Sequence, residues 1–150
     1  LGNRHPGASL LNLDLTRHQS AHLTRAVQEG IIYALNYGLG IMRQTGMEST
    51  VVRAGHTNMF LSEVFRDAFV NTTGLPRELY NTDGSQGAAR GAGLGAGIYS
   101  SPAEAFGGLK KFDEIHPRPE RQEQYAEVYL RWREALRSTL ESSASESLQM

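Results

Sequence analysis

Apolar residues in the first third of the chain recur every three or four positions, which is the spacing of one face of an α-helix. A capping-box pattern, Thr16 followed by Gln19, precedes this stripe, and Gly46 follows it as a stop signal. The number of residues between the capping box and Gly46 predicts a helix of about eight turns. Its expected core-facing residues are Leu23, Val27, Ile31, Leu35, Leu39 and Met42, with Ala26, Ala34 and Gly38 on the same side.

Before this helix, residues 8–15 alternate weakly between apolar and polar positions and are compatible with an extended segment. After it, the middle of the chain is predicted to form shorter strands and helices. A strand is predicted at 50–54, a helix at about 58–73 and a short strand at 78–81. This alternation of strands and helices predicts an α/β layer structure. The inner face of the helix is expected to carry Leu61, Val64, Phe65, Ala68 and Phe69, and its end is marked by Gly74 and Pro76.

The last part contains two stretches of unusual composition. Asp83 and Gln86 are spaced as a helix cap, and the helix body that follows, 87–97, consists almost entirely of small residues. Such a thin helix is expected to press closely on a sheet, another helix or a ligand. Ser101-Pro102 predicts a short helix, and Pro117 and Pro119 bracket a linker. A final helix, with a frayed tail at 142–150, carries the stripe Tyr125, Val128, Tyr129, Trp132, Leu136 and Leu140.

Composition excludes several functions. A net charge of −1 gives no electrostatic case for nucleic acid or an anionic membrane surface. No apolar run approaches the roughly 18 residues that a membrane span requires. The absence of cysteine excludes disulfides, thiol catalysis and thiolate metal sites, and it fits a cytoplasmic protein. Because the chain starts at Leu1 in loop-like sequence, we expect it to be a piece of a longer protein.

The strongest functional signal is the stretch 51–58, a buried strand followed by a polar turn and an amphipathic run. In α/β proteins ligands bind where a strand ends and a helix begins, because the first N–H groups of the helix are unpaired. Gly55 allows a ligand to approach the main chain, and the small and polar residues after it suit a nucleotide better than a core contact.

Other candidate sites are weaker. Residues 91–96 match the dinucleotide fingerprint formally, but that motif requires a strand just before its first glycine, so close helix packing is favoured. His18 and His22 have metal-ligand spacing on a helix without a third ligand nearby. Asp14, Asp67 and Asp83 form no recognisable pair, with Asp67 expected toward solvent and Asp83 as a cap. No phosphate-binding loop of the Walker type occurs, and no catalytic residue or metal site is predicted in this segment.

Several of these segments, in this order, resemble the C-terminal domain of FGGY-type carbohydrate kinases, and within that family the xylulokinase group. The resemblance covers about residues 1–110. It rests on the residues at 23–31, Val52-Arg53-Ala54-Gly55 with Asn58, Gly74-Leu75-Pro76, and 83–93. Where the family commonly has two or more glycines, this chain has Ala54, Gly55 and His56.

The resemblance implies a ribonuclease-H-like (actin-like ATPase) fold, a sheet flanked by helices, as an incomplete fragment of a two-domain kinase. Residues 1–110 would be a partial nucleotide-binding domain, and 111–150 a linker with an amphipathic helix. Gly55, His56, Thr57 and Asn58 would bind the nucleotide, with Asn58 at its adenosine part. ATP and Mg²⁺ would act through the full-length enzyme, which transfers the γ-phosphoryl group to a pentulose, D-xylulose.

The missing N-terminal domain would bind the sugar and supply the general base, so the segment alone is expected to be inactive. Kinases for glycerol, gluconate or rhamnulose remain open, because sugar choice lies in the missing part. A different class also remains open, a non-catalytic interaction or oligomerisation module that uses the aromatic stripe at 125–140. The expected partners are a nucleotide and the sugar, without nucleic acid or membrane, and a homodimer is left open.

Overall fold

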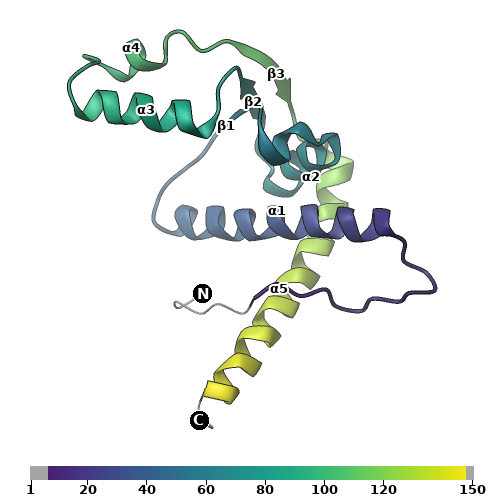
Figure 1. The fold of residues 1–150 in the computed structure, drawn as a ribbon. Helices are drawn as coiled ribbons and strands as arrows, with labels where there is room; N and C mark the ends of the chain where they lie inside the picture. The colour runs from purple at the N-terminus through teal and green to yellow at the C-terminus, as the bar shows by residue number, and fades with distance from the viewer. Residues whose placement is uncertain (1–6, 148–150) are drawn as a thin grey trace.

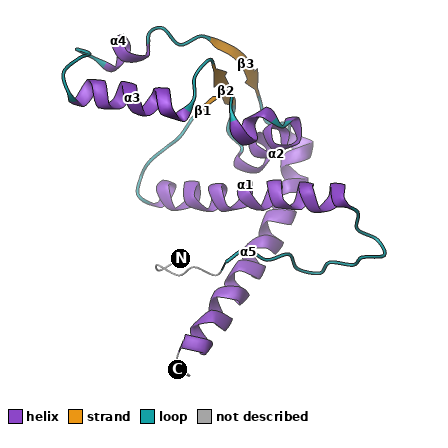
Figure 2. Cartoon of the chain, in the orientation of Figure 1, coloured by secondary structure: helices purple, strands orange, loops and turns teal. Residues whose placement is uncertain are grey.

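The computed structural model describes residues 7–147, so Leu1 and the last three residues of the expected frayed tail lie outside the described residues. The elements follow one another along the chain as helices and strands in alternation (Figures 1 and 2). They are α1 (Ser20–Gln44), β1 (Val52–Gly55), the 3₁₀ turn η1 (Asn58–Leu61), α2 (Glu63–Thr73), β2 (Arg77–Tyr80), α3 (Gly84–Gly95), α4 (Pro102–Phe106), β3 (Lys111–Ile115) and α5 (Pro119–Ser147).

The sheet of the described residues has three strands in the order β1-β2-β3 and is mixed. β1 and β2 run parallel, with Val52 opposite Arg77 and Gly55 opposite Tyr80. η1 and α2 form the crossover between them. β3 is antiparallel to β2, with an irregularity at Leu79/Tyr80. Both predicted strands are confirmed within a residue or two, whereas β3 replaces part of the expected linker before Pro117 and was not predicted.

The core lies between α1, α2 and α5, below the sheet in Figure 1. Its centre is an aromatic cluster in which the Phe65 and Phe69 rings lie 6.2 Å apart and Phe60 meets both edge-on. On the side of α5, Tyr33 packs against Tyr129 and Trp132 with ring centroids 5.9 and 6.0 Å away. Burial raises the pKa of Tyr33. The core therefore joins the first and last helices of the chain.

The face of α1 that packs on this core differs from the predicted one. Ile32, Tyr33 and Asn36 are its buried residues. The predicted stripe points the other way: Val27 is 49% exposed and Leu35 47% exposed. The helical period of the prediction was right and its inner face was wrong, because the aromatic partners on α5 lie about a hundred residues away in sequence.

The start of α1 also differs. The helix begins at Ser20 rather than after Thr16. The Thr16 hydroxyl and main-chain N–H both donate to Asp14 Oδ1, at 2.7 and 2.9 Å, and hold a local turn. At the actual start, the main-chain N–H of Gln19 donates to His22 Nδ1 at 3.1 Å. Residues 8–15 contain no strand. The predicted stop at Gly46 is confirmed by its φ of +83°.

The predicted helix at 58–73 is divided. η1 ends at Leu61, and α2 begins after Ser62, whose hydroxyl accepts the N–H of Phe65 at 3.3 Å. Of the predicted inner face, Phe65, Ala68 and Phe69 are buried, whereas Leu61 and Val64 are exposed. Gly74 ends the helix with a φ of +69°, as predicted.

Asp67 on α2 fixes the beginning of α5. It was expected toward solvent, yet its Oδ2 accepts the Nη2 of Arg121 at 2.8 Å, and its Oδ1 is paired with Arg118. The main-chain N–H of Arg118 donates to Asn71 Oδ1 at 2.8 Å. These bonds set where α5 leaves the sheet. The aromatic stripe of α5 then turns inward: Tyr125 is buried, and Val128, Tyr129 and Trp132 pack against the core.

α3 is capped as predicted, since Asp83 Oδ1 accepts the N–H of Gln86 at 2.8 Å. Its close packing is confined to Gly93, where a Cβ would lie 2.7 Å from the Tyr99 ring. At Gly87 and Gly91 a Cβ would meet nothing within 4 Å. Of the glycines of α3, Gly93 alone packs closely within the described residues, and contact of the other small residues with a ligand stays a prediction. Because 91–96 lies inside and at the end of α3, and not after a strand, it is not a dinucleotide-binding turn.

A network of ion pairs covers the outer face of the sheet. Glu78 on β2 accepts hydrogen bonds from Arg53 Nε at 2.9 Å, the Tyr80 hydroxyl at 2.8 Å and Lys111 Nζ at 3.0 Å. The bond from Arg53 is the largest of these effects, and together they lower the pKa of Glu78 from 4.5 to about 2. The network joins all three strands, which explains why the charged sequence of β3 forms a strand.

The lowered pKa of Glu78 predicts how acid affects stability. The stabilisation from this carboxylate is fully present above pH 4.5 and is lost as the pH falls toward 2. In urea unfolding at stepped pH values, Glu78→Gln should flatten the decline of the unfolding free energy across this interval. The control is Glu63→Gln, because the Glu63 side chain is 93% exposed. An equally steep decline in Glu78→Gln and the wild type would contradict the account of this network.

The final helix, α5, is assigned as far as Ser147, and the expected fraying of the tail at 142–150 stays a prediction. α4 begins after Ser101, whose hydroxyl accepts the N–H of Glu104, as predicted.

None of the described helices is both long and apolar enough to span a bilayer. The division of the chain at residue 110 stays a prediction.

Candidate functional site

The candidate site lies where the two parallel strands end. β1 ends at Gly55 and β2 at Tyr80, side by side in the sheet. A turn follows each strand, 56–57 before η1 and 81–83 before α3. In open α/β sheets ligands bind at the carboxyl ends of the strands, where loops diverge and helix N-termini point outward. The predicted residues 55–58 therefore lie at the carboxyl ends of the two parallel strands, and their binding of a ligand stays a prediction.

Gly55 is held against the second of these turns. A Cβ at this position would lie 2.2 Å from the main-chain oxygen of Thr82 and 2.9 Å from its carbonyl carbon. No side chain fits at such distances. The glycine therefore lets the two turns pack main chain to main chain and sets the place at which α3 begins. The direct contact with a ligand that the sequence suggested for Gly55 remains a prediction.

The turn after Gly55 is ordered by main-chain hydrogen bonds. The N–H of His56 donates to the Tyr80 oxygen at 3.1 Å, and the N–H of Thr57 donates to the Gly55 oxygen at 2.9 Å. The His56 ring meets Phe112 of β3 edge-on at 5.0 Å. Asn58 has a φ of +51°, a conformation that asparagine tolerates better than most residues. His56 and Asn58 are both exposed residues.

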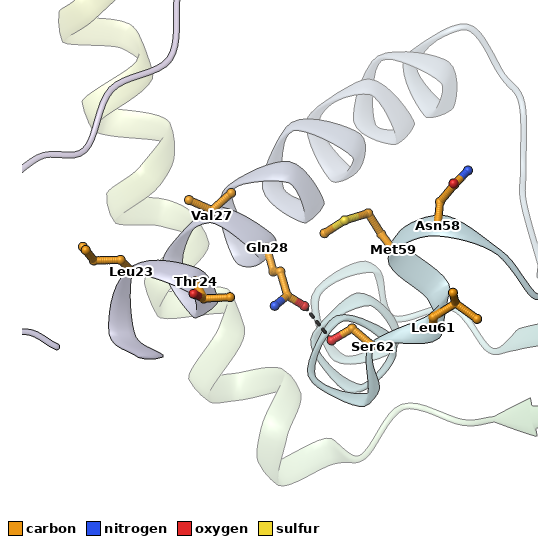
Figure 3. A pocket seen from close by; sticks show the side chains of 8 residues that line it. All are labelled: Leu23, Thr24, Val27, Gln28, Asn58, Met59, Leu61 and Ser62. Carbon is orange, nitrogen blue, oxygen red and sulfur yellow. Dashed lines mark hydrogen bonds between the residues drawn. The ribbon is translucent and has the colours of Figure 1, made fainter. Parts of the chain in front are cut away.

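An apolar groove runs beside this turn, between α1 and η1 (Figure 3). It has a volume of about 730 Å³. Met59 points toward α1, and the Ser62 hydroxyl donates to Gln28 Oε1 at 2.7 Å across the groove. Asn58 lies at its rim. The groove is lined by Leu23, Thr24, Val27, Gln28, Asn58, Met59, Leu61 and Ser62.

Sequence reasoning missed the part of this groove that α1 supplies. Gln28 was not singled out, and Val27 was expected in the core. The signal for Val27 was present as an apolar position at helical spacing, but periodicity does not tell which side of a helix the rest of the chain covers. The contact of Thr82 with Gly55 had no sequence signal of its own, because it is made by main-chain atoms.

Other predicted candidates do not form a site. His18 and His22 use their Nδ1 atoms to accept main-chain N–H groups of Asp14 and Gln19. Among residues 7–147 no group of three or more histidine, aspartate or glutamate side chains is placed to hold a metal ion. Asp14, Asp67 and Asp83 each accept local or interhelical hydrogen bonds in three separate places.

Comparison with solved structures identifies the architecture. A xyloylose kinase from Brucella ovis superposes with a TM-score of 0.72 over 89% of this chain at 26% identity. A ligand-bound xylulose kinase from Lactobacillus acidophilus has a TM-score of 0.72 over 92% at 21% identity. A gluconate kinase from the same organism has a TM-score of 0.68 over 87% at 20% identity. The chain has a sugar-kinase fold.

The expected ribonuclease-H-like architecture, a mixed sheet flanked by helices, is thereby confirmed. The chain spans 28%, 28% and 26% of the lengths of these three sugar kinases, about a quarter of each. No family model matches the sequence, and neither does any curated protein. The family likeness is therefore carried by the arrangement of elements, at low sequence identity.

Proposed function

We propose that the chain is the nucleotide-binding part of a sugar kinase that transfers the γ-phosphoryl group of Mg-ATP to a hydroxyl of a pentulose, D-xylulose. The observation that carries this proposal is the sugar-kinase fold, matched over about nine-tenths of the chain. Two of the three solved structures described above are named as xylulose or xyloylose kinases, and the proposal takes a pentulose as substrate from these names.

In this proposal the nucleotide lies at the carboxyl ends of β1 and β2. Gly55, His56 and Thr57 offer main-chain atoms and an exposed imidazole, and Asn58 contacts the adenosine part. The adjacent groove supports this placement, because a purine ring needs an apolar surface with few polar groups around it. The N-terminus of α3 packs against Gly55 at the same strand ends, with the N–H of Gln86 already capped by the Asp83 carboxylate.

The segment contributes binding rather than the proton transfer of the reaction. Phosphoryl transfer depends on positioning and charge neutralisation by groups on both sides of the nucleotide. Mg²⁺ and ATP would act together with the remainder of a longer kinase, which would hold the sugar and its general base. We therefore expect the 150-residue chain to bind nucleotide without phosphorylating D-xylulose.

Nucleotide binding can be tested through Asn58. Calorimetric titration of the chain with Mg-ATP should show binding that Asn58→Gly weakens about tenfold, because one side-chain hydrogen bond is lost. Glycine tolerates the positive φ of this position, so the variant removes the side chain without straining the turn. In parallel, a coupled assay with D-xylulose should show no turnover.

The matched control is Asn12→Gly. Asn12 has a φ of +58° and is exposed, like Asn58, but it precedes α1 in the N-terminal segment. This variant should leave nucleotide binding unchanged. Equal binding by Asn58→Gly and the wild type would remove Asn58 from the site, and phosphorylation of D-xylulose by the chain would refute the assignment of catalysis to a missing part.

A further inference from the structure

The two hydroxyl groups that line the groove between α1 and η1 are already engaged within the protein. The Thr24 hydroxyl donates to the Ser20 oxygen at 3.0 Å, one turn earlier in α1. The Ser62 hydroxyl accepts the N–H of Phe65 at 3.3 Å and donates to Gln28 Oε1 at 2.7 Å. Because a hydroxyl has one proton, neither Thr24 nor Ser62 has a proton left to donate to a ligand.

The Gln28 side chain places a donor at a fixed position in the groove. Its Oε1 is occupied by the Ser62 hydroxyl, and its nitrogen points away from Ser62 (Figure 3). Within residues 7–147 the structure gives this NH₂ group no hydrogen-bond partner. Gln28 is half-buried and belongs to α1, whereas Asn58 and Met59 form the opposite wall on η1. The groove therefore offers a ligand one oriented amide donor on the α1 side.

The rest of the lining favours an uncharged aromatic ring beside this donor. No charged side chain of residues 7–147 lines the groove, which therefore suits a neutral base better than phosphates or a sugar acid. Its volume of about 730 Å³ is in the usual range for small-molecule sites, which combine apolar walls with a few placed polar groups. The apolar members of the wall are Leu23, Val27, Met59 and Leu61.

The position of Gln28 opposite Asn58 selects the edge of the ring that it meets. In the proposed function, Asn58 at the rim contacts the adenosine part of the nucleotide. With the ribose at the rim, the ring edge that reaches α1 is the edge farthest from the sugar. In adenine this edge carries N1, which accepts hydrogen bonds. In guanine and hypoxanthine the same position carries N1–H, which donates them.

We infer that Gln28 determines the choice of base by donating a hydrogen bond from Nε2 to N1 of adenine. The inference rests on the proposed function and deepens it, because it assigns base selection to a residue of α1 outside the strand-end turn. Guanine or hypoxanthine in the same place would set their N1–H against the Gln28 donor. Ser62, the N-cap of α2, is a positioning residue here, since its hydroxyl holds the amide in this orientation.

Nucleotide analogues that differ at single atoms test the inference. In calorimetric titrations of the chain, 1-deaza-ATP, which has C–H in place of N1, should bind about tenfold more weakly than ATP, because one hydrogen bond is lost. The ligand control is 7-deaza-ATP, which keeps N1 and should bind like ATP. Gln28→Glu keeps an acceptor for the Ser62 hydroxyl and replaces the donor by a second acceptor. This variant should bind ATP no more tightly than 1-deaza-ATP.

The matched protein control is Gln44→Glu, which adds the same charge at an exposed position at the end of α1 and should keep the tenfold preference. Comparing two ligands within one protein cancels the effect of this charge, since both ligands carry the same phosphates. Circular dichroism verifies that each variant folds. Equal binding of ATP and 1-deaza-ATP by the wild type, or an undiminished preference in Gln28→Glu, would overturn the role of Gln28 and leave the nucleotide site standing. Absence of ATP binding by the wild type would refute the proposed function and this inference together.

Inosine triphosphate tests the selection of the base directly, because hypoxanthine has N1–H and lacks the 2-amino group of guanine. The wild type should prefer ATP over inosine triphosphate by about tenfold, the loss expected for one mismatched hydrogen bond. Gln28→Glu should narrow or reverse this preference, since its carboxylate can accept the N1–H. A preference that Gln28→Glu leaves unchanged would contradict the inference.

Discussion

Asp113→Ala is expected to destabilise the fold by about 3 kcal/mol, the lower end of the range for breaking a buried ion pair. Arg77 at the start of β2 is fully buried, and its Nη2 donates to Asp113 Oδ2 at 3.0 Å. Burial lowers the pKa of Arg77, and the carboxylate of Asp113 opposes that effect. Without the carboxylate, the guanidinium would remain buried beside Arg66, which lies 3.8 Å from the same carboxylate.

The reciprocal variant, Arg77→Met, separates two costs in unfolding free energy: leaving a buried charge unpaired and losing side-chain packing. In residues 7–147 the Nε and Nη1 atoms of Arg77 have no hydrogen-bond partner. Arg77→Met removes these atoms with the charge, so its cost should be well below that of Asp113→Ala. Urea unfolding followed by circular dichroism should therefore rank the wild type and Arg77→Met above Asp113→Ala. A loss below 1 kcal/mol in Asp113→Ala would show that the pair does not stabilise the sheet.

Gly55→Ala is expected to cost about 1–3 kcal/mol of stability, the usual range for overpacking, and to weaken nucleotide binding as well. The added Cβ would stand 2.2 Å from the Thr82 oxygen and 3.2 Å from Asp83 Cα. Neither atom belongs to a flexible side chain, so the turn and the start of α3 must shift. The two strand ends that frame the candidate site would then separate.

Gly91→Ala is the matched control for this variant. Gly91 lies inside α3, and a Cβ there meets nothing within 4 Å. Alanine should raise the unfolding free energy by about 0.5–1 kcal/mol, because it restricts the unfolded chain. Thermal unfolding of the two variants should therefore shift in opposite directions. A Gly55→Ala protein as stable as the wild type would mean that the two turns do not pack as described.

The order of elements could be predicted from the sequence, but the sides that they bury could not. For α1, periodicity gave the helix, yet Ile32 and Tyr33 form the core because Tyr129 and Trp132 come from the far end of the chain. A helix with two apolar sides has no local signal that selects the inner one. The side that was predicted to be buried instead exposes Val27 and Leu35.

β3 could not be predicted for a different reason. Its sequence, Lys-Phe-Asp-Glu-Ile, carries three charges in five residues and lacks the alternation of a half-buried strand. Asp113 acquires its partner Arg77 only when β2 is beside it, and Lys111 gains Glu78 of β2 in addition to Glu114 of its own strand. The strand that ends at Gly55 was predicted from the sequence, but the reason for glycine there, a main-chain contact with Thr82, required the structure.

The most direct test of the central claim, a nucleotide site at the ends of β1 and β2, is a titration of ¹⁵N-labelled chain with Mg-ATP followed by amide chemical shifts. The account predicts the largest shifts at residues 55–58 and at 84–86, the start of α3, with smaller ones along the groove at Gln28 and Met59. Shifts confined to other surfaces, or no shifts at saturating nucleotide, would contradict it.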